Sequence, residues 1–344
     1  MQHYSAPLWL TGPGALGGHA QTIWPALASR VHPDRRSPEV NYRRERWTTP
    51  DGDFIDVDWL DAAADGNAFK DGRPLLVLFH GLEGSSQSHY ARAFAWWAHT
   101  QGWDYAVPHF RGCSGELNLA PRTYYSGDHA EIDWILKRLA RHGRPEGSAS
   151  ARPVLAVGIS LGGNMLLRWA QEAGAAAPDT ARAVAALCAP IDLEASAKAL
   201  SHGVGGRLYT RMFLRTLKAK ALGKLAQHPG LFDVNALQAS NSFYTYDNAF
   251  TAPVHGFANT EDYWARCSAK PHLRHMRHVP ALVLNARNDP MVPAWCLPTP
   301  GEVGPAVTLW QPHQGGHVGF PAGRFPGHVA QLPEAVGQWL TQHL

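Results

Sequence analysis

The chain is poor in charged residues. Only 17% of its 344 residues are Asp, Glu, Lys or Arg, and the formal net charge is +3. So small a charge leaves no electrostatic footprint for nucleic acid, and no nucleic-acid partner is predicted. Hydrophobic residues make up 45% of the chain, which is ample material for a large core and disfavours disorder.

Cysteines are few, and long apolar runs are missing. The four cysteines, Cys113, Cys188, Cys267 and Cys296, have no paired spacing, so we expect reduced thiols. No apolar run approaches membrane-spanning length, and the first residues do not form a signal-peptide pattern. We therefore expect a cytoplasmic protein without a transmembrane segment, with peripheral membrane contact left open. The histidines show no metal-ligand spacing, so no metal or cofactor is predicted, and the oligomeric state is not indicated.

Short buried runs alternate with helical patterns along most of the chain. A hairpin over 45–49 and 54–60 is expected first, because Pro50-Asp51-Gly52-Asp53 separates two strand-like segments. Apolar runs then follow at 75–80, 105–110, 154–160, 184–188, 281–285 and 307–311, with helical patterns at 88–101, 129–142, 161–172 and from about 332. Such alternation predicts an α/β fold with a mostly parallel central sheet and helices on both faces.

The alternation stops over residues 194–271, which show helical and loop patterns only. We interpret this segment as a helical cap inserted into one domain that spans 1–344. One cap helix is expected to place an apolar stripe over the core and a basic stripe in solvent or against an anionic surface. The apolar stripe is Leu208, Met212, Phe213 and Leu217, and the basic stripe is Arg207, Arg211, Arg215 and Lys218.

Gly158-Ile159-Ser160-Leu161-Gly162 stands between a strand pattern and a helix pattern. This context is the one that a nucleophile elbow requires, because a sharp turn there exposes the serine hydroxyl above the sheet. The small glycines let strand and helix approach closely. Ser160 is therefore the candidate nucleophile.

A serine nucleophile needs an imidazole base and an acid that orients the imidazole. Asp289 directly follows the run 281–285, at the end of a predicted parallel strand. Two histidines, His313 and His317, follow the run 307–311. We choose His317 because Gly315, Gly316 and Gly319 free its loop to reach the serine, and His313 remains the alternative.

Backbone amides usually stabilise the oxyanion in acyl transfer. Leu161, directly after the nucleophile, supplies one expected amide. The loop after the run 75–80 should supply the other, and we assign it to Leu82, with Gly81 as the alternative. Cys113 is not expected to be catalytic, because no histidine is placed by the sequence to activate it.

Several segments together resemble the YheT-like family of α/β hydrolases, which includes bacterial esterases, fungal medium-chain ester synthases and esterases, and animal abhydrolase-domain lipases. They are 18–23, 80–86, 110–116, 158–164, 247–257, the Asp289 segment and 316–320. The resemblance implies an α/β-hydrolase fold and a triad of Ser160, Asp289 and His317.

The leading functional hypothesis is a serine hydrolase that cleaves carboxylic esters with short- to medium-chain acyl groups, or acylglycerols. The expected partner is thus a small-molecule or lipid ester. An alcohol O-acyltransferase would use the same acyl-enzyme, and the sequence does not separate the two. A catalytically silent binding protein with this fold is the third reading, which an intact triad disfavours.

Overall fold

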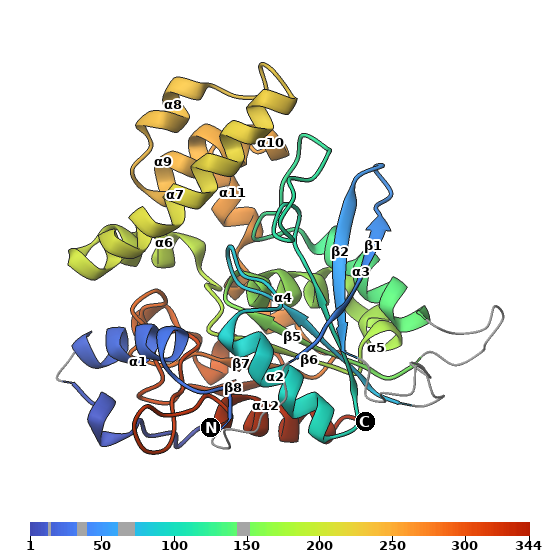
Figure 1. Ribbon diagram of the computed structural model, residues 1–344, viewed down its shortest axis with the longest axis vertical. Helices are drawn as coiled ribbons and strands as arrows, with labels where there is room; N and C mark the ends of the chain where they lie inside the picture. The colour runs from blue at the N-terminus through green and yellow to red at the C-terminus, as the bar shows by residue number, and fades with distance from the viewer. Residues whose placement is uncertain (13–14, 33–39, 61–72, 143–151) are drawn as a thin grey trace.

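The computed structural model describes residues 1–12, 15–32, 40–60, 73–142 and 152–344. Within them, one eight-stranded sheet forms the centre of the molecule (Figure 1), in the order β1-β2-β4-β3-β5-β6-β7-β8. Its strands are β1 (Arg43–Thr48), β2 (Phe54–Leu60), β3 (Leu75–Phe79), β4 (Asp104–Pro108), β5 (Val154–Ile159), β6 (Ala183–Leu187), β7 (Ala281–Leu284) and β8 (Val307–Trp310).

Six of these strands run parallel, and the first two form the predicted hairpin. β1 pairs antiparallel with β2, with Thr48 opposite Phe54, and β2 pairs antiparallel with β4. The remaining neighbours, from β4 to β8, pair in parallel. The predicted α/β fold with a mostly parallel sheet is confirmed.

Helices bury both faces of the sheet. In β3, Leu75, Val77 and Phe79 pack into the core on one face, whereas Leu76 and Leu78 pack into the core on the other. Alternation of this kind explains why the strand is apolar throughout. The first core is shared with α3 (His129–Arg141) and α4 (Leu161–Ala173), and the second with α2 (His89–Thr100) and α12 (Gln331–Thr341).

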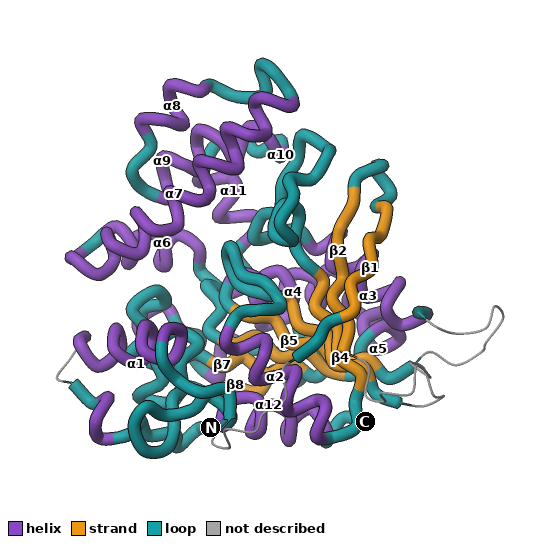
Figure 2. Tube along the Cα trace, viewed as in Figure 1, coloured by secondary structure: helices purple, strands orange, loops and turns teal. Residues whose placement is uncertain are grey.

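Between β6 and β7 the chain leaves the sheet and forms only helices and loops, and the structure describes every residue there (Figure 2). We call this segment the helical wall. Its α-helices and π-helix are α6 (Leu193–Ser201), α7 (Gly203–Gln227), α8 (Val234–Ala239), α9 (Phe243–Tyr246), the π-helix η3 (Asp247–Thr251), α10 (Ala252–His255) and α11 (Thr260–Cys267). The wall has its own small apolar core, which includes Leu214, Leu237 and Phe250. The cap boundaries 194–271 stay a prediction.

The apolar stripe predicted to pack over the core from α7 is wrong for two of its four residues. Leu208 and Met212 are 60% and 55% exposed, whereas Phe213 is partly buried and Leu217 is buried. At 3.6 residues per turn, positions nine residues apart lie about 180° apart, so Leu208 and Leu217 face opposite sides. The outer face of α7 is therefore a mixture of basic and apolar side chains.

The remaining helical elements are short, apart from α1 at the N-terminal end. They are α1 (Ala15–Leu27), α5 (Ala177–Thr180) and the 3-10 turns η1 (Leu8–Leu10), η2 (Gly174–Ala176), η4 (Lys270–His275), η5 (Ala294–Cys296) and η6 (Pro300–Glu302). Among the described helices, none combines the length and apolar character needed to cross a bilayer.

Candidate active site

Ser160 stands at the sharp turn between β5 and α4. Its backbone φ is +51°, in the left-handed region that non-glycine residues seldom adopt, and its amide donates a hydrogen bond to the Leu187 carbonyl oxygen at 2.8 Å. A Cβ atom at Gly162 would overlap the backbone carbonyl groups of Phe79 and His80. Close packing of this helix on β3 therefore requires glycine, as the elbow pattern predicts.

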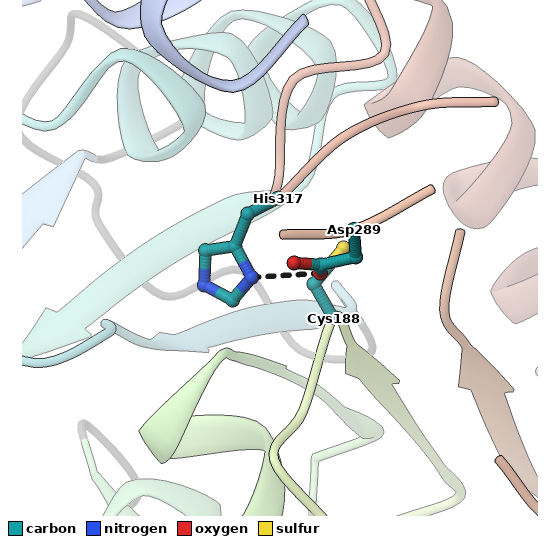
Figure 3. Close-up of side chains that lie close together, drawn as sticks. All are labelled: Cys188, Asp289 and His317. Carbon is teal, nitrogen blue, oxygen red and sulfur yellow. Dashed lines mark hydrogen bonds and ion pairs between the residues drawn. The ribbon is translucent and has the colours of Figure 1, made fainter. Parts of the chain in front are cut away.

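The structure brings Ser160, His317 and Asp289 together in a chain of short contacts. His317 Nε2 lies 2.9 Å from Ser160 Oγ. On the other side of the ring, His317 Nδ1 lies 2.8 Å from Asp289 Oδ2, the contact drawn in Figure 3. The second carboxylate oxygen of Asp289 accepts hydrogen bonds from the amides of Met291 and Val292 at 2.8 and 3.2 Å. Asp289 is thus fixed and buried, which suits an acid that orients an imidazole.

His313 is placed differently from His317. Its side chain is exposed, and within the described residues it makes no hydrogen bond to Ser160 or Asp289. Of His313 and His317, only His317 therefore has the position of a base for Ser160.

A segment of α1 holds the His317 loop, a role that no local sequence signal predicts. The Thr22 hydroxyl oxygen accepts a hydrogen bond from the His317 amide at 2.9 Å. The Gln21 side-chain oxygen accepts hydrogen bonds from the Gly315 amide and from Asn288 Nδ2, both at 2.9 Å. Asn288 precedes the acid, so this support links the loops of the acid and the base.

The two amides assigned to an oxyanion hole are free to donate. Among the described residues, the Leu82 and Leu161 amides make no hydrogen bond, whereas the Tyr90 hydroxyl oxygen accepts one from the Gly81 amide at 3.0 Å. The Tyr124 hydroxyl oxygen likewise accepts one from the Glu83 amide at 3.1 Å. This difference favours Leu82 over Gly81 as the donor in this loop.

Ser160 and His317 lie in a pocket that also includes Leu82, Phe213 and Leu217 in its walls. One wall consists of the loops after β3, β4, β5, β7 and β8, and we call it the strand-end wall. The helical wall supplies the other side, so that residues far apart in the chain, such as Leu82, Phe213 and His317, border one space. Most of the lining is apolar, as expected for an ester pocket.

Cys113 lies close to this pocket but is not set up as a nucleophile. Lys220 Nζ lies 3.6 Å from its Sγ atom, yet burial raises the pKa of the Cys113 thiol to about 11. The thiol therefore stays protonated near neutral pH, and a protonated thiol is a weak nucleophile.

Cys188, Asp289 and His317 place one potential ligand atom each within 4.8 Å of one another (Figure 3). Burial raises the pKa of the Cys188 thiol well above its usual range, so this sulfur is a poor metal ligand. His317 Nδ1 also contacts Asp289, and His317 Nε2 contacts Ser160. The cluster therefore fits an acid–base pair better than a metal centre.

Comparison with known proteins gives the family. Residues 74–323 match the model of the alpha/beta hydrolase fold. The Escherichia coli protein YheT, which is named as an esterase, is 37% identical over 328 residues, or 95% of this chain and 91% of that protein. The chain belongs to the α/β hydrolase family. Within this family it is YheT-like, and it is an enzyme of the esterase and lipase type.

More distant α/β hydrolases agree. Human Phospholipase ABHD3 is 27% identical over 88% of this chain and 72% of its own length. The solved structure of the Pyrococcus furiosus esterase Pf2001 has a TM-score of 0.51 at 15% identity, covering 88% of this chain and 90% of that one. Mouse alpha/beta hydrolase domain-containing protein 10 has a TM-score of 0.52 at 12% identity, covering 87% and 99%. At these identities the solved structures show the shared fold alone.

Proposed function

We propose that this hydrolase cleaves carboxylic esters through an acyl-enzyme on Ser160. The observation that carries the proposal is the contact chain from Ser160 Oγ through His317 to Asp289, at 2.9 and 2.8 Å. A hydroxyl, an imidazole and a buried carboxylate in this order are what activates serine at neutral pH. The three residues come from the loops after β5, β8 and β7, which a parallel sheet gathers at one edge.

In the acylation step, Ser160 Oγ attacks the ester carbonyl carbon while its proton passes to His317 Nε2. Asp289 stabilises the imidazolium, and the amides of Leu82 and Leu161 donate to the oxyanion. The carbon–alkoxy bond then breaks, and His317 gives its proton to the leaving alcohol. Water repeats the sequence on the acyl-enzyme, which releases the acid and restores the serine.

The substrates proposed are short- to medium-chain acyl esters or acylglycerols. Phe213, Leu217, Leu193 and Leu200 line the pocket beside Ser160 and supply an apolar surface for an acyl chain. The predicted cap, 194–271, provides three of them, and Leu193 directly precedes it. Each methylene that they bury contributes about 0.8 kcal/mol, so kcat/KM should rise with chain length until the pocket is full.

An alcohol O-acyltransferase is the second candidate. A yeast protein named Medium-chain fatty acid ethyl ester synthase/esterase 2 is 30% identical over 72% of this chain, and its name joins both activities. The two reactions share the acyl-enzyme and differ in whether water or an alcohol accepts the acyl group. A catalytically silent role would leave the paired Ser160, His317 and Asp289 without purpose.

A panel of p-nitrophenyl esters from acetyl to decanoyl, with and without added ethanol, tests the proposal beside Ser160→Ala. We expect hydrolysis that rises with acyl length and is lost in the variant. Ethyl ester formation faster than acid release would instead assign the transferase. Absence of turnover and of fluorophosphonate labelling would overturn both in favour of a silent fold.

A further inference from the structure

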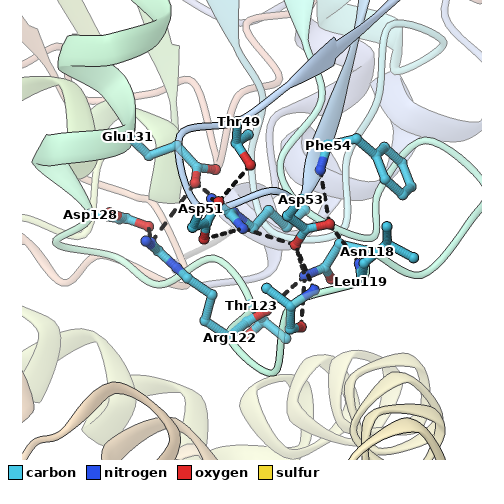
Figure 4. Close-up of polar contacts among 12 residues, drawn as sticks. Thr49, Asp51, Asp53, Phe54, Asn118, Leu119, Arg122, Thr123, Asp128 and Glu131 are labelled. Carbon is cyan, nitrogen blue, oxygen red and sulfur yellow. Dashed lines mark hydrogen bonds and ion pairs between the residues drawn. The ribbon is translucent and has the colours of Figure 1, made fainter.

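Among the described residues, five acidic or basic side chains line the pocket, and four of them have ion-pair partners. Lys220 Nζ lies 2.8 Å from Glu83 Oε1, and His317 contacts Asp289. The fourth is Arg111, whose partners belong to the polar network in Figure 4, the carboxylates of Asp51, Asp53 and Glu131 at 2.6 to 2.9 Å.

Asp247 is the fifth, and among the described residues it has no cation as a partner. Its Oδ1 accepts a hydrogen bond from the Thr251 hydroxyl at 2.7 Å, and its Oδ2 accepts one from Trp264 Nε1 at 2.9 Å. Both donors are neutral, and the residue is only 8% exposed. A carboxylate has about four acceptor positions, so two remain open.

A buried carboxylate without a counterion is unfavourable, and proteins usually pair such a group. Asp247 begins the π-helix η3, and such helical irregularities are frequent at functional sites. An unbalanced negative charge in a substrate pocket attracts a positively charged group. The missing partner would therefore arrive with a ligand.

Aromatic residues line the same side of the pocket. They are Phe243, Tyr246, Phe250, Tyr263 and Trp264, all from the helical wall. Trp264 donates a hydrogen bond to Asp247, and Tyr246 directly precedes Asp247 in the chain. Aromatic faces attract ammonium groups, most strongly where water is excluded. A carboxylate among such rings suits an organic cation better than a metal ion, which needs several oxygen ligands.

We propose that Asp247 and these aromatic residues form a subsite for an ammonium group carried by the ester substrate. The ligand class is an ester whose alcohol or acyl part carries a primary or quaternary ammonium group. This inference rests on the proposed function, because the ester is turned over at Ser160. The strand-end wall would hold the ester group, and the helical wall would hold the cation.

A pair of esters with the same shape tests this subsite. Butyrylcholine and 3,3-dimethylbutyl butyrate differ in having nitrogen or carbon at one position, and so in charge. We expect the wild type to favour the choline ester in kcat/KM by about tenfold. This ratio corresponds to about 1.4 kcal/mol of stabilisation of the cation by the carboxylate and the aromatic rings. In Asp247→Asn this ratio should fall close to one.

Asp247→Asn can keep both hydrogen bonds, because its oxygen accepts from Trp264 and its amide donates to the Thr251 hydroxyl. The matched control is Glu194→Gln, an exposed acid on α6 outside this pocket, which should keep the wild-type ratio. Should Asp247→Asn not fold, inhibition of the wild type by tetramethylammonium decides: competitive inhibition of 3,3-dimethylbutyl butyrate hydrolysis is expected.

The outcomes separate this inference from the function on which it rests. Hydrolysis of both esters at equal kcat/KM by the wild type, without inhibition by tetramethylammonium, overturns the subsite and leaves the serine hydrolase intact. An unchanged ratio in a folded Asp247→Asn also overturns it. Failure of Ser160 to react with a fluorophosphonate and of either ester to be hydrolysed overturns the proposed function itself.

Discussion

The two walls of the pocket differ in how their polar groups are satisfied. In the strand-end wall each proposed catalytic side chain has its partner nearby, as Asp289 does with His317 and two backbone amides. In the helical wall Asp247 has only neutral donors. In the strand-end wall the polar groups are paired without a ligand, which suits a reaction common to many esters. In the helical wall one carboxylate lacks a counterion, which suits a site that selects among ester substrates.

The largest effect expected from this comparison belongs to the strand-end wall. Ser160→Ala should lower kcat by a factor on the order of 10⁶, because the enzyme loses its nucleophile and no acyl-enzyme can form. Steady-state hydrolysis of an activated ester measures it, with circular dichroism to show that the fold is kept. More than about a tenth of the activity left in a folded variant would remove Ser160 from the mechanism.

His317 and His313, in the loop directly after β8, give the next contrast. His317→Ala should lose activity nearly as completely as Ser160→Ala, because the base that contacts Ser160 Oγ is gone. His313→Ala should keep wild-type kcat, because that side chain is exposed to solvent. The same ester assay on both variants serves as test and control. Reversal of the two results would assign the base to His313.

Much of the strand-end wall could be predicted from the sequence because its signals are local. Ser160 is identified by its neighbours, and Asp289 and His317 each follow an apolar strand within a few residues. The support from Thr22 could not be predicted, since it contacts a residue 295 positions away. The segment Gly18-His19-Ala20-Gln21-Thr22-Ile23 is part of the family resemblance, but the resemblance does not indicate which residues this segment contacts.

The helical wall was less predictable for a related reason. Helical periodicity indicated that α7 exists, but both faces of this helix contain apolar residues, so the pattern did not identify the face that packs on the pocket. Tertiary contacts decide that face. Asp247 was noted only as the first residue of a segment matching the family, because burial and missing partners are not visible in a sequence.

One ion pair joins the two walls. Lys220 of α7 contacts Glu83, which has a φ of +57° and directly follows Leu82. Lys220→Met should lower kcat by about tenfold with KM little changed, because a partly buried carboxylate loses a partner worth about 1 to 3 kcal/mol and the oxyanion loop loses a restraint. Lys198→Met, an exposed lysine on α6, is the control. An effect on KM alone would show that Lys220 only binds substrate.

In the helical wall, the buried carboxylate of Asp247 should also lower the stability of the folded protein, by an amount that depends on pH. Burial raises the pKa of Asp247 from 3.8 to about 6, so the folded state holds this proton more tightly than the unfolded state. The stability from that proton is present at low pH and is lost as the pH rises through about 6. Asp247→Asn has no such loss.

The measurement is the difference in Tm between Asp247→Asn and the wild type. We expect it to shift in favour of the variant between about pH 5 and about pH 8. Glu194→Gln, changed in an exposed acid, should show no comparable shift. A difference that is the same at both pH values would mean that Asp247 does not change protonation on folding.

The smallest effect concerns the outer face of α7. Arg207, Arg211 and Arg215 are exposed beside Leu208 and Met212, a mixture that suits an anionic lipid surface. We expect weak binding to phosphatidylserine vesicles that falls as salt rises, with each basic residue contributing about 1 kcal/mol. Co-sedimentation of the wild type and of a variant with the three arginines changed to Gln measures it. Equal binding by the two, or none at low salt, would leave this face in solvent.

The most direct test of the central claim, that the strand-end wall performs ester hydrolysis, is to locate a fluorophosphonate label by mass spectrometry. We expect one added phosphonyl group on the peptide that contains Ser160, and less of it when an ester substrate competes. Label on another residue, or hydrolysis of esters by a protein that takes no label at Ser160, would contradict it.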